Sequence, residues 1–252
     1  MYPLLLLTLI ETCSGDVSTS VYTAGDGFFQ PPTDATQYCN SEEASLVEGV
    51  MRNYSKRLMP PKDGVDVSVE MTINDISSLS ELHSEFVLDI FFSEIWIDPN
   101  LNYSRLPGAC SKNITLDLDL LNAVWQPNTC IVNSKSAEIH SSPSENVFLI
   151  LYDDGRVWKN CRMRVKAPCD INLQNFPFDR QRCHLVFESY SYNSQKVRLK
   201  WFDPNPISFV KKIELPDFLL DKHDIHYFNV MYPNGLWDQL KVRTDSHRRK
   251  MT

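Results

Sequence analysis

The chain has little positive charge and lacks the short motifs that mark common catalytic and metal sites. Its 252 residues include 25 Lys and Arg against 32 Asp and Glu, a net charge of -7, whereas nucleic-acid-binding domains are usually basic. CxxC and HExxH motifs are absent and the six His are scattered, which disfavours a zinc site. The Gly-x-Ser-x-Gly motif of many hydrolases is missing. We therefore expect that the protein is not an enzyme and that it binds no cofactor, metal or nucleic acid.

Long apolar runs are also missing, because no stretch after Gly15 approaches the roughly 20 apolar residues of a membrane-spanning helix. The one apolar run, Pro3 to Ile10, is short and precedes the small residues Ser14 and Gly15. It predicts a signal peptide over residues 1–15, with a buried strand as the alternative. Residues 16–38, rich in Ser, Thr, Gly and Pro, are typical of a flexible leader.

The cysteines and sequons agree with export through the secretory pathway. Loss of Cys13 with the signal peptide leaves an even number of cysteines, which favours disulfides in an oxidising compartment. Sequons for N-glycosylation begin at Asn53, Asn102 and Asn113.

Periodicity predicts one helix followed by many strands. Asn40 and Glu43 fit a helix start, and Pro60-Pro61 a stop. The chain then alternates apolar and polar residues with period two, beginning at Val65. We expect strands at 65–73, 86–97, 147–152, 156–165, 184–190, 197–201, 225–230 and 237–242. The fold class is therefore mainly β, a two-sheet immunoglobulin-like β-sandwich with one N-terminal α-helix.

A short loop between Cys169 and Cys183 carries an unusually apolar tip. Thirteen residues separate the two cysteines, and Phe176-Pro177-Phe178-Asp179 lies among them. A disulfide closing a loop of about 15 residues stabilises a fold by roughly 3 kcal/mol. Phe176-Pro177 is a candidate cis peptide bond. A stapled hairpin explains the cysteines, but the apolar tip predicts docking against an apolar partner.

This loop resembles the disulfide loop of the Cys-loop, pentameric ligand-gated ion channels. The resemblance continues in "IWIDPNL" (95–101), in "VWQPN" (124–128) followed by Asn133, and in "FESYSY" (187–192), and it covers about residues 38–243. The sequence of these segments is most similar to that of glycine-, GABA-type and related invertebrate channels. The adjacent cysteine pair of nicotinic α-type subunits is absent from 227–238.

The resemblance implies an extracellular ligand-binding domain over residues 39–243, with the transmitter held between two subunits by aromatic rings. It implies a principal face and a complementary face. For Phe91, Tyr190, Tyr232 and Trp237 the alternative role is packing. The principal face would use Glu188, Ser189, Tyr190, Tyr232 and Trp237, and the complementary face Phe91, Phe148 and Asn160. Trp96 and Trp125 are expected in the core. Phe176, Pro177, Phe178 and Asp179 would form the coupling loop.

The resemblance also implies a Cys169–Cys183 disulfide. Cys110 is expected to pair with Cys130. Cys39 and Cys161 would either pair or remain small buried side chains.

One departure from the family pattern concerns the ligand. Relatives gated by amino acids often place an Arg where this chain has Ser93, and a carboxylate without a charge partner binds poorly. The expected ligand is a small ammonium-bearing transmitter such as acetylcholine or an amine, with a GABA- or glycine-like ligand as the alternative. Partners would be related subunits in a homo- or hetero-pentamer.

A second departure concerns residues 244–252, which are polar and basic. They predict a divergent tail without membrane helices, as in a truncated channel subunit that reaches the membrane only through a missing pore domain or partner subunits. A full-length receptor would lie at the cell surface. The alternative is a soluble, secreted transmitter-binding protein of the same fold.

Overall fold

The computed structural model describes residues 35–60, 63–106, 109 and 111–249, and for residues 35–42 it describes the backbone alone. The predicted signal peptide lies outside the described residues, as do the side chains of Cys39, Asn40 and Cys110. None of the helices in the described part of the chain is long and apolar enough to cross a membrane.

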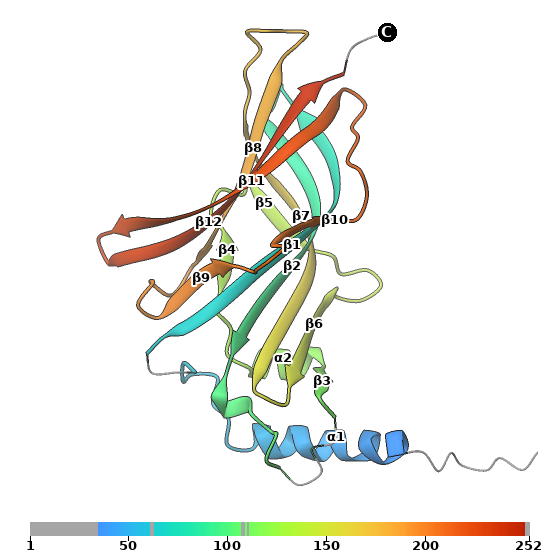
Figure 1. Cartoon of the computed structure of the whole chain (residues 1–252), viewed down its shortest axis with the longest axis vertical. Helices are drawn as coiled ribbons and strands as arrows, with labels where there is room; N and C mark the ends of the chain where they lie inside the picture. Colours follow the sequence, from blue (N-terminus) through green and yellow to red (C-terminus); the bar gives the residue numbers. More distant parts are fainter. Residues whose placement is uncertain (1–34, 61–62, 107–108, 110, 250–252) are drawn as a thin grey trace, which may run out of the picture. The chain divides into compact units, whose positions relative to one another are not determined.

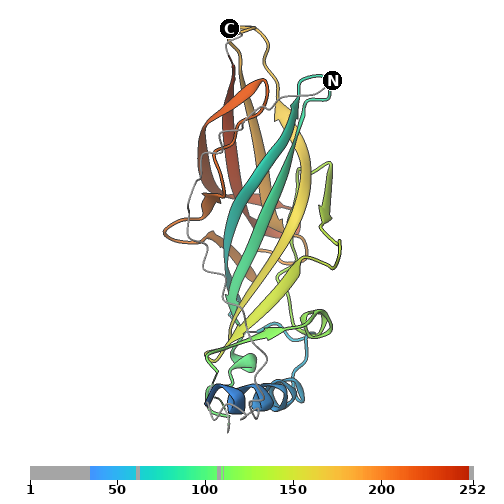
Figure 2. The ribbon, with the colours of Figure 1, turned by 90° about the vertical axis from the view of Figure 1, so that its right-hand side faces the viewer.

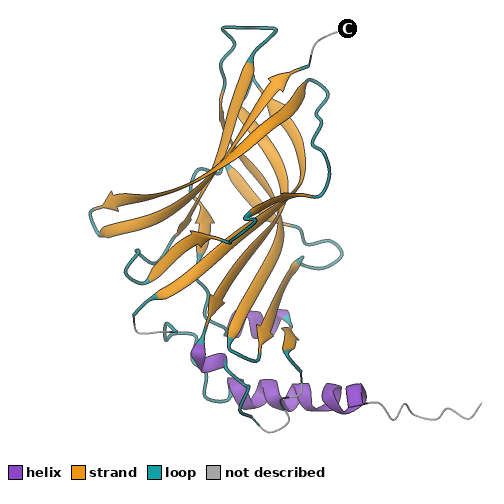
Figure 3. Cartoon of the chain, in the orientation of Figure 1, coloured by secondary structure: helices purple, strands orange, loops and turns teal. Residues whose placement is uncertain are grey.

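The chain forms one long helix followed by strands (Figures 1 and 3). The helices are α1 (Ala35–Met51), the short 3-10 turn η1 (Pro99–Leu101) and α2 (Leu118–Ala123). The strands are β1 (Val65–Ser80), β2 (Glu85–Ile97), β3 (Asn113–Leu116), β4 (Thr129–Ile131), β5 (Ser136–Ile139), β6 (Val147–Tyr152), β7 (Arg156–Asp170), β8 (Arg180–Ser189), β9 (Val197–Trp201), β10 (Ile207–Phe209), β11 (Phe218–Tyr232) and β12 (Gly235–Arg248).

The strands form two layers that share β7. In the first sheet the order is β10-β1-β2-β7, with β9 beside β1 and with β6 and β5 beside β7. In the second sheet the order is β8-β12-β11, with β4 beside β8. The two sheets join where Cys169 and Asp170 of β7 pair with β8. Helix α1 lies across one end of the sheets and the loop between Cys169 and Cys183 lies at the other (Figures 1 and 2). The predicted β-sandwich with an N-terminal helix is confirmed.

Aromatic side chains fill the space between the layers. Phe92 of β2 stacks on Phe187 of β8 with ring centroids 5.1 Å apart, and Trp201 of β9 meets Phe187 edge-on at 6.2 Å. Trp96 and Trp125 are both buried and lie edge to face at 6.1 Å, as expected for core residues. The Phe187 contacts join the first sheet to the second.

Several expected boundaries are wrong. Helix α1 begins at Ala35, so the expected leader boundary at residue 38 falls inside it. The short strands β3, β4, β5 and β10 and helix α2 were not predicted, because three to six residues give too little periodicity. Strand β12 runs to Arg248, past the expected domain end at residue 243. Its polar residues Thr244 to Ser246 are buried because β12 pairs with β8 on one side and β11 on the other.

The Phe187 contacts give a stability prediction. We expect Phe187→Ala to lower the free energy of unfolding by about 3–5 kcal/mol, because it removes a fully buried ring that touches both sheets. The matched control is Phe178→Ala, whose ring is 71% exposed, with an expected cost within about 0.5 kcal/mol. Urea unfolding followed by circular dichroism measures both, and equal losses would contradict this description of the core.

Candidate functional site

A buried carboxylate and two aromatic rings meet where β8 lies beside the β11–β12 hairpin. Glu188 is buried, and its Oε2 accepts hydrogen bonds from Gln239 Nε2 at 2.5 Å and from the Tyr232 hydroxyl at 3.4 Å. The Tyr232 and Trp237 rings lie edge to face, with centroids 6.2 Å apart. We call Glu188, Tyr232, Trp237 and Gln239 the carboxylate cage.

The carboxylate of the cage has no cationic partner among the described residues. None of the described Lys, Arg or His side chains forms an ion pair with Glu188, whose nearest polar partners are neutral. Burial, followed by the charge of Glu188, raises the pKa of the Tyr232 phenol, so that ring stays neutral at physiological pH. The cage therefore presents a negative charge beside two aromatic faces, which is the environment that attracts an organic cation.

Ser189 and Tyr190, the other residues expected on this face, have different surroundings. The Ser189 side chain is buried and its hydroxyl donates to the Pro127 carbonyl at 2.8 Å, so it holds β8 in place. Tyr190 is 78% exposed, and its backbone N–H donates to the Asn128 carbonyl. Its ring is therefore free to contact a ligand.

The residues expected on the complementary face lie on the first sheet. Asn160 of β7 pairs with Ser93 of β2 on one side and with Phe148 of β6 on the other. The Asn160 amide donates to the Ser93 hydroxyl at 2.7 Å, and Phe148 meets Trp158 edge-on at 5.7 Å. Phe91, two residues before Ser93, lies on the same face of the strand. The structure thus brings together Phe91, Phe148 and Asn160 as one surface.

Arg162 is a neighbour of this surface that the sequence did not reveal. Its guanidinium lies 5.7 Å from the centre of the Phe91 ring and donates two hydrogen bonds to Asp89, at 3.0 and 2.6 Å. The Arg162 contacts hold the pKa of Asp89 below its usual range. Because Asp89 already pairs with Arg162, this guanidinium is less available to a carboxylate ligand.

The two surfaces remain separate within one chain. Among the described residues, no hydrogen bond, ion pair or ring contact joins the carboxylate cage to Phe91, Phe148 or Asn160. The chain therefore carries two separate surfaces.

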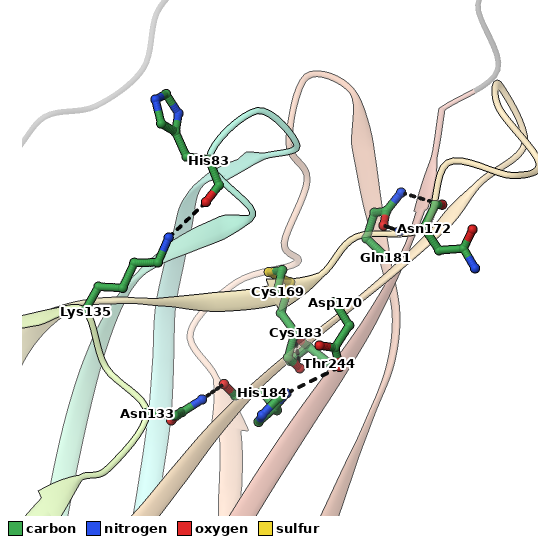
Figure 4. Close-up of a disulfide and its surroundings, with 10 residues drawn as sticks. All are labelled: His83, Asn133, Lys135, Cys169, Asp170, Asn172, Gln181, Cys183, His184 and Thr244. Carbon is green, nitrogen blue, oxygen red and sulfur yellow. Dashed lines mark hydrogen bonds and ion pairs between the residues drawn. A yellow bond between two sulfur atoms is a disulfide. The ribbon is translucent and has the colours of Figure 1, made fainter.

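The disulfide loop is tied to its neighbours by side-chain hydrogen bonds (Figure 4). Cys169 and Cys183 form a disulfide, as expected. Gln181 bridges the loop by donating to the Asn172 carbonyl and accepting from the Asn172 N–H. The Phe176-Pro177 bond is cis, and the Phe176 and Phe178 rings are 59% and 71% exposed, which confirms an apolar tip.

Arg248, in the segment expected to be a divergent tail, docks against this loop. Its guanidinium binds the buried carboxylate of Asp179 at 2.7 and 3.0 Å and Glu81 at 2.5 Å. It also lies over the rings of Phe176 and Phe218, 5.0 and 4.5 Å from their centres. The polar composition of residues 244–248 thus reflects buried partners, and the reading of these residues as a divergent tail is wrong.

The expected Cys110–Cys130 disulfide is also wrong. Cys130 is a free, half-buried thiol on β4, opposite Glu188 of β8. Burial and then the Glu188 charge raise the pKa of this thiol, which keeps it protonated. Cys161 is free and buried in the core, matching the second of its two expected roles.

The sequon residues Asn53, Asn102 and Asn113 are all exposed, so their glycosylation stays a prediction. Among the described residues, no group of three or more His, Cys, Asp and Glu side chains is arranged to hold a metal ion.

Sequence comparison with known proteins shows which family the chain resembles. Residues 43–247 match the sequence model described as the neurotransmitter-gated ion-channel ligand binding domain. The serotonin-gated chloride channel mod-1 of Caenorhabditis elegans is 45% identical over 82% of this chain and 42% of its own length. The acetylcholine-gated chloride channel subunit acc-1 of the same organism is 40% identical over 83% of the chain and 45% of its own length. The human glycine receptor subunit beta is 31% identical over 79% of the chain and 40% of its own length. The chain thus aligns with less than half of each of these three relatives.

The Arg248 contacts predict a large stability loss on substitution. We expect Arg248→Gln to cost about 3–5 kcal/mol, because it leaves the buried Asp179 carboxylate without its cation. Arg249→Gln is the matched control, since the Arg249–Glu214 pair is exposed on both sides and such pairs contribute about 0–1 kcal/mol. Chemical unfolding of both variants decides; a cost for Arg248→Gln no larger than that of the control would contradict the prediction.

The same pair predicts a pH dependence. Hydrogen bonds from Arg248 lower the pKa of Asp179, so its stabilising contribution is complete above the ordinary Asp pKa of about 3.9. The contribution is lost as pH falls through the lower pKa of the folded state. We expect Asp179→Asn to be less stable than wild type at pH 6, with the difference shrinking toward pH 2. The control is Asp170→Asn, on the same loop, whose side chain is 80% exposed and 3.9 Å from His184; such an exposed pair should change stability at pH 6 by at most about 1 kcal/mol.

Proposed function

Since the chain belongs to the family of neurotransmitter-gated ion-channel ligand-binding domains, we propose that it binds a small organic amine without a carboxylate, at the interface between two subunits. The carboxylate cage and Tyr190 would form the principal face. Phe91, Phe148 and Asn160 of a neighbouring subunit would form the complementary face. The partners are further copies of this chain or related subunits, assembled as a pentamer.

The observation that carries the proposal is the buried Glu188 carboxylate with neutral hydrogen-bond partners. A buried carboxylate is costly unless a cation or several donors stabilise it, and here Gln239 and Tyr232 supply two donors. An incoming ammonium group would add the missing charge, and the Tyr232 and Trp237 rings would add cation–π contacts of about 0.5–2 kcal/mol each.

The complementary surface supports the exclusion of carboxylate-bearing ligands. Ser93 replaces the cation that would hold a carboxylate, and Arg162 is already bound by Asp89. Two relatives, a serotonin-gated and an acetylcholine-gated chloride channel, are gated by ligands of the same class.

The exposed coupling loop supports action as part of a channel subunit. Phe176 and Phe178 present an apolar tip next to Arg248, at the end of the last strand. A soluble transmitter-binding protein, the second candidate, has no need of an apolar docking tip. The disulfide and three exposed sequon residues support passage through the secretory pathway.

Titration of the purified, secreted chain tests the ligand class. Intrinsic tryptophan fluorescence, to which Trp237 contributes, is followed at protein concentrations where the chain associates. We expect serotonin or acetylcholine to bind more tightly than glycine or GABA. Tighter binding of glycine or GABA than of both amines would contradict the proposal.

Substitution of the cage carboxylate tests its role. We expect Glu188→Gln to weaken amine binding by about 10–100-fold, because a hydrogen bond to a charged group contributes about 1.5–3 kcal/mol. The matched control is Glu138→Gln, on the exposed strand β5, which should leave the affinity unchanged. An unchanged affinity in Glu188→Gln, with the fold intact by circular dichroism, would remove Glu188 from the site.

A further inference from the structure

A second groove lies on the reverse side of the β11–β12 hairpin. It has a volume of about 670 Å³ and lies between β9 and the hairpin, with Leu199 and Trp201 on one side and Tyr227 and Leu236 on the other. Most of the surface that lines the groove is apolar, although polar and charged residues also contribute to it. Ligand pockets are typically about 300–1,000 Å³, so the groove can hold a small organic molecule.

The floor of the groove is a buried carboxylate, Asp238, which is 5% exposed. One of its oxygens accepts from the Leu199 N–H at 3.1 Å, and the other from the Tyr227 hydroxyl at 3.2 Å and the Asn229 amide at 2.6 Å. All three donors are neutral. None of the described Lys, Arg or His side chains forms an ion pair with Asp238, and burial raises its pKa.

The cations at the rim compensate this carboxylate only in part, because their direct partners lie elsewhere. The Arg198 guanidinium binds Asp66 at 2.5 Å and the Asp63 carbonyl at 2.9 Å. Lys200 lies 3.8 Å from the same Asp66 carboxylate, and its side chain is 58% exposed. Asp238 therefore has no ion pair with a described cation, although the nearby Arg198 charge partly offsets the rise in its pKa. Aromatic side chains stand on both walls.

This groove is distinct from the carboxylate cage. Successive residues of a strand point to opposite faces, so Trp237 faces the cage and Asp238 faces the groove. Tyr227 and Asn229 alternate in the same way with Phe228 and Val230 on β11. A ligand in the groove therefore contacts the back of the hairpin that supplies Tyr232 and Trp237.

We propose that this groove is a second binding site for a small aromatic amine, contained within one subunit. The ammonium group would reach Asp238 and Asn229, and the aromatic ring would lie between Trp201 and Tyr227. The proposal does not depend on subunit assembly or on the identity of the ligand at the cage.

Fluorine NMR of the chain labelled with 5-fluorotryptophan separates the two sites, because Trp201 reports on the groove and Trp237 on the cage. The chain has five Trp residues, whose resonances are assigned with single Trp→Phe variants. The probes are phenethylamine, its neutral analogue 2-phenylethanol and the anion phenylacetate. Of the three probes, we expect only phenethylamine to shift the Trp201 resonance in a saturable way. The shift should also occur in the Glu188→Gln variant, because Glu188 belongs to the cage.

Asp238→Asn should weaken the Trp201 response to phenethylamine at least tenfold. The control Asp75→Asn, an exposed carboxyl that pairs with Lys211, should leave it unchanged. If Asp238→Asn does not fold, Lys200→Glu replaces an exposed rim cation by an anion, and we expect it to tighten phenethylamine binding at least threefold.

Four outcomes would overturn the proposal. These are an unshifted Trp201 resonance, an equal response in Asp238→Asn, an unchanged affinity in Lys200→Glu, and an equal response to 2-phenylethanol or phenylacetate. If phenethylamine shifts the Trp201 resonance but not the Trp237 resonance in the assembled chain, the result would contradict the proposed function at the cage and would support the groove site.

Discussion

The register of β8 is the constraint on which the core, the disulfide loop and the cage all depend. Asn133 fixes it by donating to the His184 carbonyl at 2.8 Å and accepting from the Val186 N–H at 2.9 Å. Cys183 fixes it again through the disulfide (Figure 4). A slip of one residue would exchange the positions of Phe187 and Glu188. The core would then lose its central ring and the cage would lose its carboxylate.

The charged side chains divide into two groups with different physical roles. Asp179 and Asp89 are bound by Arg248 and Arg162, so their charges are compensated within the chain. These pairs hold the disulfide loop against the last strand and compensate the charge of Arg162 beside Phe91. Glu188 and Asp238 have only neutral hydrogen-bond partners and lie beside aromatic rings. The β11–β12 hairpin thus separates two carboxylates that have no ion pair with a described cation, one on each face, and an organic cation suits both.

Much of the fold could be predicted from the sequence because its strands alternate clearly. The expected strands at 147–152 and 197–201 coincide with β6 and β9. The disulfide and the core positions of Trp96 and Trp125 were also predicted correctly. The end of β12 was not predicted correctly. Polar residues such as Asp245, Ser246 and Arg248 are typical of a solvated tail when their cross-strand partners are unknown. Burial of polar residues depends on partners far along the chain, as with Arg248 and Asp179.

The candidate site shows the same limit. Sequence resemblance named Glu188, Tyr232 and Trp237, which the structure brings together. It missed Gln239, although the two-residue spacing from Trp237 placed it on the same strand face. It also missed Arg162, because only the pairing of β2 with β7 brings its guanidinium over Phe91 and beside Asp89. Cys130 was wrongly paired because spacing along the chain does not reveal which strand faces it.

The central claim is that one chain carries two half-sites that form a complete amine site only when subunits associate. The most direct test measures amine binding separately for the monomeric and the assembled fractions of the secreted chain, after separation by size-exclusion chromatography with light scattering. The account predicts saturable amine binding in the assembled fraction, with one ligand for each subunit interface, and at least tenfold weaker cage binding in the monomer. Equal affinity at the cage in both fractions would show that the site is complete within one chain and would contradict the account.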